Sequence, residues 1–185
     1  DNSFSSFEEH ISLFNKPLRL VINTSGFLHS NLIKPEKRLS HVCRAGLIKN
    51  LSVNTIAPIL IAKSIEKFIS PNLPFSFSSL SARVGSISDN RLGGWYSYRA
   101  SKAAQNQLLK TLSIEWRRKF PLSIVTLLHP GTCDTQLSRP FQKTIPKDKL
   151  FTPAQSAEYL LNIISKQKLS DTGKFLAWDS SIIPW

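Results

Sequence analysis

The sequence contains no methionine, only two cysteines and no apolar run near the roughly 18 residues that a membrane span needs. Cys43 and Cys133 form no Cys-x-x-Cys pair and join no His/Cys cluster, which argues against a metal site or a disulfide framework. Reduced thiols in an intracellular compartment are the simplest interpretation. The missing methionine suggests that the natural chain starts upstream, so that any targeting peptide would be lost.

Acidic residues are also few, 12 against 24 Lys and Arg, which gives a net charge of +12. Such an excess can indicate a nucleic acid, an anionic membrane surface or an anionic ligand. The basic residues are scattered, however, and their densest groups, at 34–38, 117–119 and 143–149, do not alternate with aromatic residues as in a single-strand-binding groove. We therefore favour a solvated surface over a nucleic-acid patch.

The seven glycines never form a Gly-x-x-x-Gly-x-Gly run or a similar turn. In dinucleotide-binding proteins these glycines let the backbone approach the pyrophosphate at the N-terminus of a helix. Gly93-Gly94 comes too late in the chain and lacks the spacing. The sequence thus contains no glycine-rich turn that could bind the pyrophosphate.

Strand and helix patterns alternate along the chain, which favours an α/β fold with a parallel sheet in one domain over 1–185. A polar loop over 27–44 reads as a surface excursion. Pro58 should kink the second helix or mark a boundary between two helical pieces, and serines interrupt the second strand. The expected helices cover 5–14, 47–69, 97–119 and 154–166, and the expected strands cover 18–22, 75–80, 122–128 and 174–178.

Tyr98 and Lys102 lie four residues apart on the third expected helix, on one face of it. A free phenol has a pKa of about 10 and is a poor general base near neutrality. A neighbouring ammonium favours the phenolate, so the pair could exchange a proton with an alcohol or carbonyl oxygen. Taken alone, Tyr-x-x-x-Lys is a weak signal, and an ordinary surface pair would be the better interpretation.

The order of several motifs along the chain favours a catalytic Tyr–Lys pair over a surface pair. Asn23-Thr24-Ser25-Gly26 ends a strand, Tyr98-Arg99-Ala100-Ser101-Lys102 opens a helix, and Pro130-Gly131-Thr132-Cys133-Asp134-Thr135 follows another strand. In this order the chain resembles the short-chain dehydrogenase/reductase family. The segments 80–87 and 93–102 look like its C-factor and sniffer-like carbonyl reductase branch. The tail Gly173 to Asp179, with Ile183-Pro184-Trp185, is similar to plant members of that branch.

The resemblance implies a Rossmann-like fold and an NAD(P)-dependent oxidoreductase acting on a small carbonyl or alcohol, with NADP preferred over NAD. Tyr98 would be the general acid/base, Lys102 would lower its pKa and bind the nicotinamide ribose, and Asn54 would hold a relay water. The cofactor would also contact five residues at strand ends: Asn23, Gly26, Pro130, Gly131 and Thr135.

The substrate-orienting serine is less clear. Many members carry it as the second serine of Ser-Ser-x-x-Gly, where this chain has Ala82. Ser81 is our candidate, with Ser86, or no serine at all, as the alternatives. Cys133 is interpreted as a passive thiol, and neither His29 nor His129 is given a role.

Relative to the family, the first strands, their helices and the glycine-rich turn are missing. We therefore expect an incomplete sheet with strand 18–22 as an exposed apolar edge, an N-terminal truncation, and weak NAD(P) binding. The competing hypotheses are a non-catalytic interaction or signalling module and, ranked last, a nucleic-acid binder. The family resemblance also implies a homo-oligomer through 47–69 and 97–119, and a location in the cytoplasm or a plastid.

Overall fold

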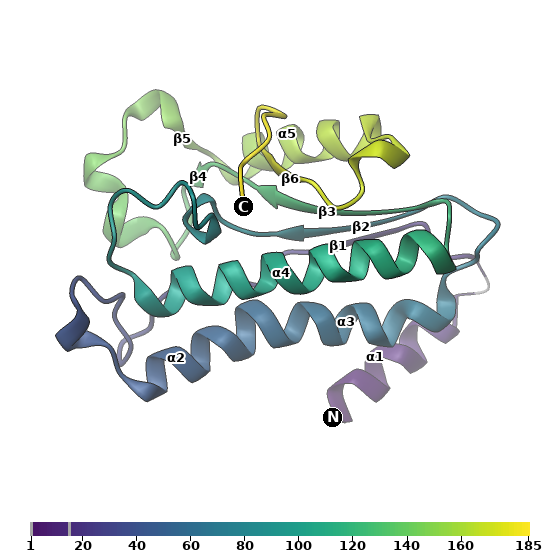
Figure 1. Ribbon diagram of the computed structural model, residues 1–185, viewed down its shortest axis with the longest axis horizontal. Coiled ribbons are helices and arrows are strands. Elements are labelled where there is room, and N and C mark those ends of the chain that lie inside the picture. The colour runs from purple at the N-terminus through teal and green to yellow at the C-terminus, as the bar shows by residue number, and fades with distance from the viewer. Residues whose placement is uncertain (1, 15) are drawn as a thin grey trace.

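The computed structural model describes residues 2–14 and 16–185, and it is built around one four-stranded parallel sheet in the order β1-β2-β3-β6 (Figure 1). The strands are β1 (Leu20–Asn23), β2 (Phe75–Leu80), β3 (Ser123–His129), β4 (Thr132–Cys133), β5 (Leu150–Phe151) and β6 (Phe175–Ala177). β4 and β5 form a separate parallel pair, which the sequence analysis did not predict. The α/β class with a parallel sheet is confirmed.

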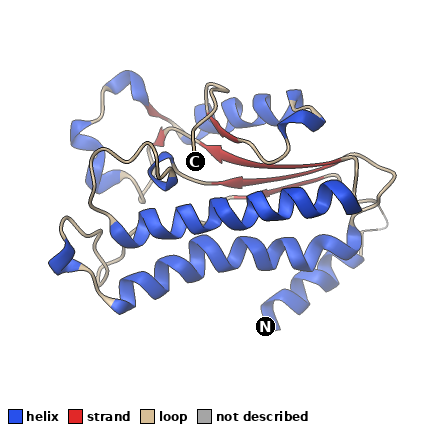
Figure 2. Cartoon of the chain, in the orientation of Figure 1, coloured by secondary structure: helices blue, strands red, loops and turns tan. Residues whose placement is uncertain are grey.

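The helices form layers on the two faces of this sheet, as Figure 2 shows. The α-helices are α1 (Asn2–Ser12), α2 (Arg44–Leu51), α3 (Ala57–Ile65), α4 (Tyr96–Lys119) and α5 (Pro153–Lys166). A π-helical turn, η2 (Ser52–Ile56), joins α2 to α3, and short 3₁₀ turns are η1 (Leu39–His41), η3 (Glu66–Phe68), η4 (Arg83–Gly85), η5 (Arg139–Thr144), η6 (Lys147–Lys149) and η7 (Leu169–Asp171). The α2–α3 segment and α4 lie side by side on one face, and α5 covers the other.

Most of the core lies between the sheet and α4. Trp116 is fully buried there and meets Phe75, Phe77 and Phe120 edge to face, with ring centroids 5.8–6.0 Å apart. A second, smaller cluster joins β3 and β6 to α5 through Leu128, Leu160, Ile163 and Leu176. Both faces of the central strands are therefore covered, as expected for a parallel sheet.

The serines of β2 do not prevent burial, because each of the enclosed hydroxyls has a partner. Ser78 Oγ lies 3.1 Å from Thr126 Oγ1 on the neighbouring strand. Ser79 Oγ accepts hydrogen bonds from Asn23 Nδ2 and Gln105 Nε2, both at 2.8 Å. A buried polar group that is paired avoids most of its desolvation cost.

Pro58 affects the long helical segment in a specific way. It carries no N–H, so the carbonyl of Asn54 cannot accept the usual i+4 hydrogen bond. The chain widens by one residue immediately before it: the Ala57 N–H donates to Ser52 O, an i−5 contact. The result is a π-turn within a helical run over 44–68, in place of a sharp kink.

The same run, Arg44–Phe68, is long and apolar enough to cross a membrane by length and composition, although a third of its most apolar window is buried in the fold. The sequence analysis found no uninterrupted apolar run near the length of such a span. In the structure the segment packs beside α4, where Thr55 Oγ1 donates to Ser101 O at 2.7 Å. This contact is typical of a helix inside a folded domain.

The first helix and the first strand show how the structure departs from the expected bounds. The first helix spans Asn2–Ser12, so Phe14 lies outside it and is 73% exposed. The first strand was expected over 18–22 as an exposed apolar edge; it begins at Leu20, which is 41% exposed. Among the described residues β1 pairs only with β2, and this edge position is the reason for its exposure.

Candidate active site

A pocket of about 660 Å³ opens at the carboxyl ends of β1, β2 and β3. This is the edge at which open parallel sheets bind their ligands. Five of the residues predicted for the cofactor or for catalysis at strand ends border it: Gly26, Ser81, Pro130, Gly131 and Thr135. The rest of the lining is largely apolar and includes Leu28, Trp95, Leu137, Phe141 and Ile145.

Tyr98 and Lys102 both reach this pocket from the first turns of α4. The Lys102 Nζ lies 6.0 Å from the centroid of the Tyr98 ring. Among the described residues no group forms a hydrogen bond with the Tyr98 hydroxyl, which borders the cavity. The structure thus brings together the two side chains that the i,i+4 spacing placed on one helix face.

Burial, however, shifts both groups toward their neutral forms. It raises the pKa of Tyr98 to about 12 and lowers the pKa of Lys102 to about 8. The Lys102 ammonium is directed at Leu80 O (2.9 Å) and Gln105 Oε1 (3.0 Å). The acidified phenol that the sequence predicts is therefore not what the protein alone produces.

Asn54 lies behind the pocket and is completely buried. Its Oδ1 accepts the Phe27 N–H at 2.7 Å, and its Nδ2 donates to Phe27 O at 2.8 Å and to Ser101 Oγ at 2.9 Å. Ser101 Oγ in turn donates to the carbonyl of Tyr98 at 2.8 Å. The Asn54 side chain therefore fastens the segment after β1 to the helix that carries Tyr98.

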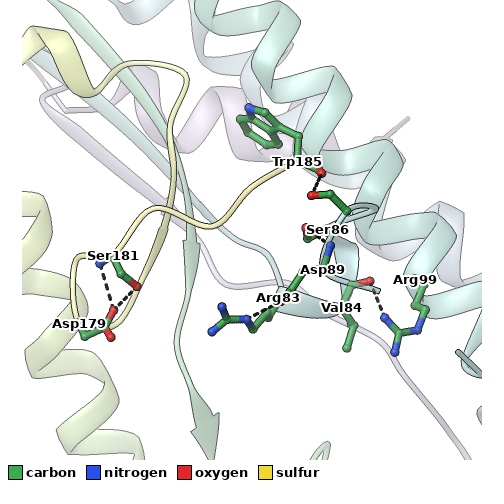
Figure 3. A network of polar contacts seen from close by, with 9 residues as sticks. Arg83, Val84, Ser86, Asp89, Arg99, Asp179, Ser181 and Trp185 are labelled. Atoms are coloured by element: carbon green, nitrogen blue, oxygen red, sulfur yellow. Dashed lines mark hydrogen bonds and ion pairs between the residues drawn. The ribbon is translucent and has the colours of Figure 1, made fainter. Parts of the chain in front are cut away.

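The two candidate serines have different surroundings. Ser81 borders the pocket, and its hydroxyl donates to Asn106 Oδ1 at 2.6 Å. Ser86 is outside the pocket lining, and its Oγ accepts the Asp89 N–H at 3.2 Å. Figure 3 shows Ser86 and Asp89 in the network that holds the turn after β2, with the Arg83–Asp89 ion pair (2.6 Å) beside them.

Asn23 is the predicted cofactor residue that the structure turns inward. It is 5% exposed and does not border the pocket. Its Nδ2 donates to Ser79, and its Oδ1 accepts from the Ser25 N–H and hydroxyl. Its neighbours Thr24, Ser25 and Gly26 line the cavity in its place.

Gly131 shows why its position excludes a side chain. Its φ is +74°, and an added Cβ would lie 2.5 Å from the Phe151 ring and 3.1 Å from Trp178. Phe151 belongs to β5, which pairs with β4 directly after Gly131. This close packing holds the base of the loop over 134–149, which places Phe141 and Ile145 against the pocket.

Two residues at the site were missed or given no role by the sequence analysis. His129, at the end of β3, borders the pocket, and its buried Nδ1 has no hydrogen-bond partner within the described chain. Burial first, and then the nearby Arg83 charge, lowers its pKa to about 4. Glu36 is only 3% exposed, although a surface loop was expected there, and it accepts hydrogen bonds from Ser97 at the start of α4.

The fold and the pocket together define a Rossmann-like α/β protein with a Tyr–Lys pair at the carboxyl edge of its sheet. No family model matches the sequence. A dehydrogenase of 1-hydroxy-2-glutathionyl-2-methyl-3-butene from Rhodococcus sp. is 29% identical over 137 residues, covering 74% of this chain and 58% of that protein. C-signal from Myxococcus xanthus is 26% identical over 148 residues, covering 80% of this chain and 83% of its own length.

Solved structures of carbonyl reductases are similar to this chain over its whole length. The carbonyl reductase Sniffer of D. melanogaster aligns with a TM-score of 0.85 at 23% identity, covering all of this chain and 74% of that one. The NADPH-bound carbonyl reductase from chicken fatty liver aligns at 0.81 and 25%, covering 100% and 71%. In sequence and in fold the chain is thus similar to short-chain dehydrogenases/reductases, with C-signal and sniffer-like carbonyl reductases among the similar proteins.

Proposed function

We propose that this chain carries the catalytic half of an NAD(P)-dependent carbonyl reductase or alcohol dehydrogenase, with Tyr98 as the proton donor to the carbonyl oxygen. The observation that supports this most directly is the free Tyr98 hydroxyl at an apolar pocket, with the Lys102 ammonium on the same helix face. Because the chain spans 58% of the Rhodococcus dehydrogenase, the reaction of the whole protein is part of the proposal.

The residues around the pocket fit the nicotinamide end of a dinucleotide. Gly26, Pro130, Gly131 and Thr135 would hold the nicotinamide and its ribose, together with Lys102, at the strand ends. When bound, the cofactor supplies the hydride, and Tyr98 supplies the proton. Two similar solved structures, the carbonyl reductase from chicken fatty liver and a protein from Burkholderia multivorans, hold NADPH and NADP. This supports a nicotinamide cofactor, and we propose NADP in preference to NAD.

Ser81 is proposed to orient the substrate, because its oxygen lies at the pocket while its proton is held by Asn106. Asn54 is proposed to act in the proton relay. Since its side chain is fully engaged with Phe27 and Ser101, this role falls to its backbone carbonyl, which Pro58 deprives of the usual helical donor.

We also propose that the chain by itself holds the cofactor weakly, because the sequence contains no glycine-rich turn for the pyrophosphate. A thermal-shift titration with NADPH tests this. We expect little stabilisation up to millimolar NADPH, and a clear, saturable shift would refute the impairment. A matched titration of Thr135→Trp, at a position that lines the pocket, identifies whether any shift comes from this pocket.

The catalytic assignment is tested by NADPH oxidation with a panel of small carbonyl compounds at high cofactor concentration. Tyr98→Phe removes the hydroxyl and should abolish turnover, whereas Tyr96→Phe, two residues away and 41% exposed, should leave it unchanged. Equal rates for wild type and Tyr98→Phe would favour the second candidate, a non-catalytic interaction or signalling module. The likeness to C-signal and the absent phosphate turn are the observations that support that candidate.

Partners and location remain proposals of the same kind. The helical run 44–68 and α4 lie side by side with apolar side chains left exposed, among them Ile48 (51%), Ile56 (48%) and Ile114 (46%). We propose that a homo-oligomer covers this face in an intracellular compartment, either the cytoplasm or a plastid. Light scattering tests the oligomer: Ile48→Lys with Ile114→Lys should yield a monomer, and an unchanged mass would refute the proposal.

A further inference from the structure

Glu36 is a buried carboxylate in the loop between β1 and α2, and no part of the proposed reaction uses it. Its sequence neighbours Lys34, Lys37 and Arg38 suggest a solvated loop, yet Glu36 is only 3% exposed. A buried carboxylate is costly unless hydrogen bonds or opposite charge compensate it. The source of that compensation is therefore informative.

The compensation comes from the first turn of α4. The Ser97 N–H donates to Glu36 Oε2 at 3.2 Å, and the Ser97 hydroxyl donates to Oε1. The first N–H groups of a helix have no partner inside it, and Trp95, the residue before α4, offers no side-chain cap. Glu36 supplies this cap from a distant segment, and its negative charge is favoured at a helix N-terminus.

The turn that leads into α4 is shaped around the same residue. Gly93, Gly94 and Trp95 have φ values of +64°, +65° and +52°, three left-handed residues in succession. A tryptophan in that region is strained and persists only where its surroundings hold it. Here the Trp95 N–H donates to Glu36 O at 2.5 Å, so Glu36 grips the turn through its backbone and the helix through its carboxylate.

The Trp95 side chain links this turn to Tyr98 through aromatic contacts. The Trp95 ring lies edge-on to the Tyr98 ring at 6.1 Å and contacts the Phe141 ring at 4.8 Å. Tyr98 directly follows Ser97 along the helix. Any movement of the first turn of α4 would therefore displace the Tyr98 hydroxyl within the pocket.

We propose that Glu36 is a positioning residue: its carboxylate and carbonyl fix the strained start of α4 and thereby hold the Tyr98 hydroxyl at the pocket. The structural part of this inference stands on the contacts alone. Its consequence for turnover rests on the proposed function, so the two parts are measured separately.

Hydrogen exchange tests the structural part. Glu36→Ala should speed exchange of the Ser97 amide at least ten-fold while residues 105–116 of the same helix keep their rates. Glu36→Gln, which retains an oxygen acceptor, should stay within about three-fold of wild type. Glu9→Ala, an exposed glutamate on α1, controls for the lost charge and should have no effect. Unchanged exchange at Ser97 in Glu36→Ala would overturn the proposal.

A second variant covers the case in which Glu36→Ala fails to fold. Ser97→Ala removes only the hydroxyl donor, and we expect a loss of protection of at least three-fold confined to the first turn of α4. Wild-type protection in Ser97→Ala would then overturn the proposal. A loss of protection spread evenly over 96–119 would also overturn the proposal, because Glu36 contacts only the first turn of α4 and its effect should be local.

Kinetics test the consequence for Tyr98. With a carbonyl substrate, Glu36→Ala should lower kcat at least ten-fold and leave KM within two-fold, and Glu36→Gln should restore most of kcat. A raised KM with unchanged kcat would refute a role in placing the phenol. If wild type and Tyr98→Phe reduce the substrate at equal, measurable rates, the proposed function fails, and the exchange experiment alone tests the positioning role of Glu36.

Discussion

Acid should destabilise this protein through His129, and the size of the effect follows from its environment. Burial and the Arg83 charge lower the pKa of His129 from 6.5 to about 4, and its Nδ1 has no partner. The folded state therefore binds the imidazole proton more weakly than the unfolded chain does. Stability from this group is present above pH 6.5 and is lost as the pH falls through 4.

A shift of about 2.5 pKa units corresponds to roughly 3 kcal/mol once the pH is well below 4. Most of it is felt earlier: between pH 7 and pH 5 the linkage relation gives a loss of about 2 kcal/mol. That is a large part of the 5–15 kcal/mol that is typical for a folded domain. The effect should therefore be visible well above the pH at which carboxylates titrate.

Urea unfolding followed by tryptophan fluorescence at pH 7 and pH 5 measures this loss. His129→Gln, which cannot gain a proton, should unfold with nearly the same free energy at both pH values. His10→Gln and His41→Gln, at exposed positions, should keep the wild-type loss. If wild type loses less than about 0.5 kcal/mol, or if His129→Gln loses as much as wild type, the buried-imidazole argument is wrong.

Three further substitutions test the packing that supports the pocket. Trp116→Ala should cost about 3–5 kcal/mol in urea unfolding, because it empties the centre of the core, and Trp116→Phe should cost clearly less. Gly131→Ala should lower the free energy of unfolding by roughly 1–3 kcal/mol, because the new Cβ would collide with the Phe151 ring and the backbone there is left-handed. An unchanged free energy of unfolding would contradict this geometry. Asn54→Ala should lower the free energy of unfolding by about 2–3 kcal/mol and speed amide exchange at Phe27. Unchanged exchange at Phe27 would refute the link that Asn54 makes between Phe27 and Ser101.

Much of the fold follows from local patterns in the sequence. The cap of α5 is formed by sequence neighbours: Thr152 Oγ1 accepts the Gln155 N–H at 3.2 Å, and Gln155 Oε1 accepts the Thr152 N–H at 2.9 Å. Proline positions and strand periodicity likewise located α4, β2 and β3 within one or two residues. These features depend on neighbours in the sequence, so a single chain reveals them.

Features that depend on distant contacts could not be predicted in this way. Glu36 is a charged residue among basic neighbours, and only the approach of Ser97, 61 residues later, makes its burial tolerable. The same holds for the serines of β2, whose partners are Thr126, Gln105 and Asn23. The only local hint was their odd presence in a buried strand, which in hindsight signals a polar network.

The sequence argument and the structure disagree about the pKa of Tyr98 beside Lys102. The spacing correctly brings the two groups to one pocket, but the sequence contains no measure of burial, and burial opposes the expected tuning. With a pKa near 12, Tyr98 is a neutral phenol at physiological pH and a weaker acid than a free phenol. In the proposed carbonyl reduction such a phenol would be a poor proton donor, and in alcohol oxidation its phenolate would be scarce. Base chemistry at Tyr98 would require further positive charge in the pocket to favour the phenolate.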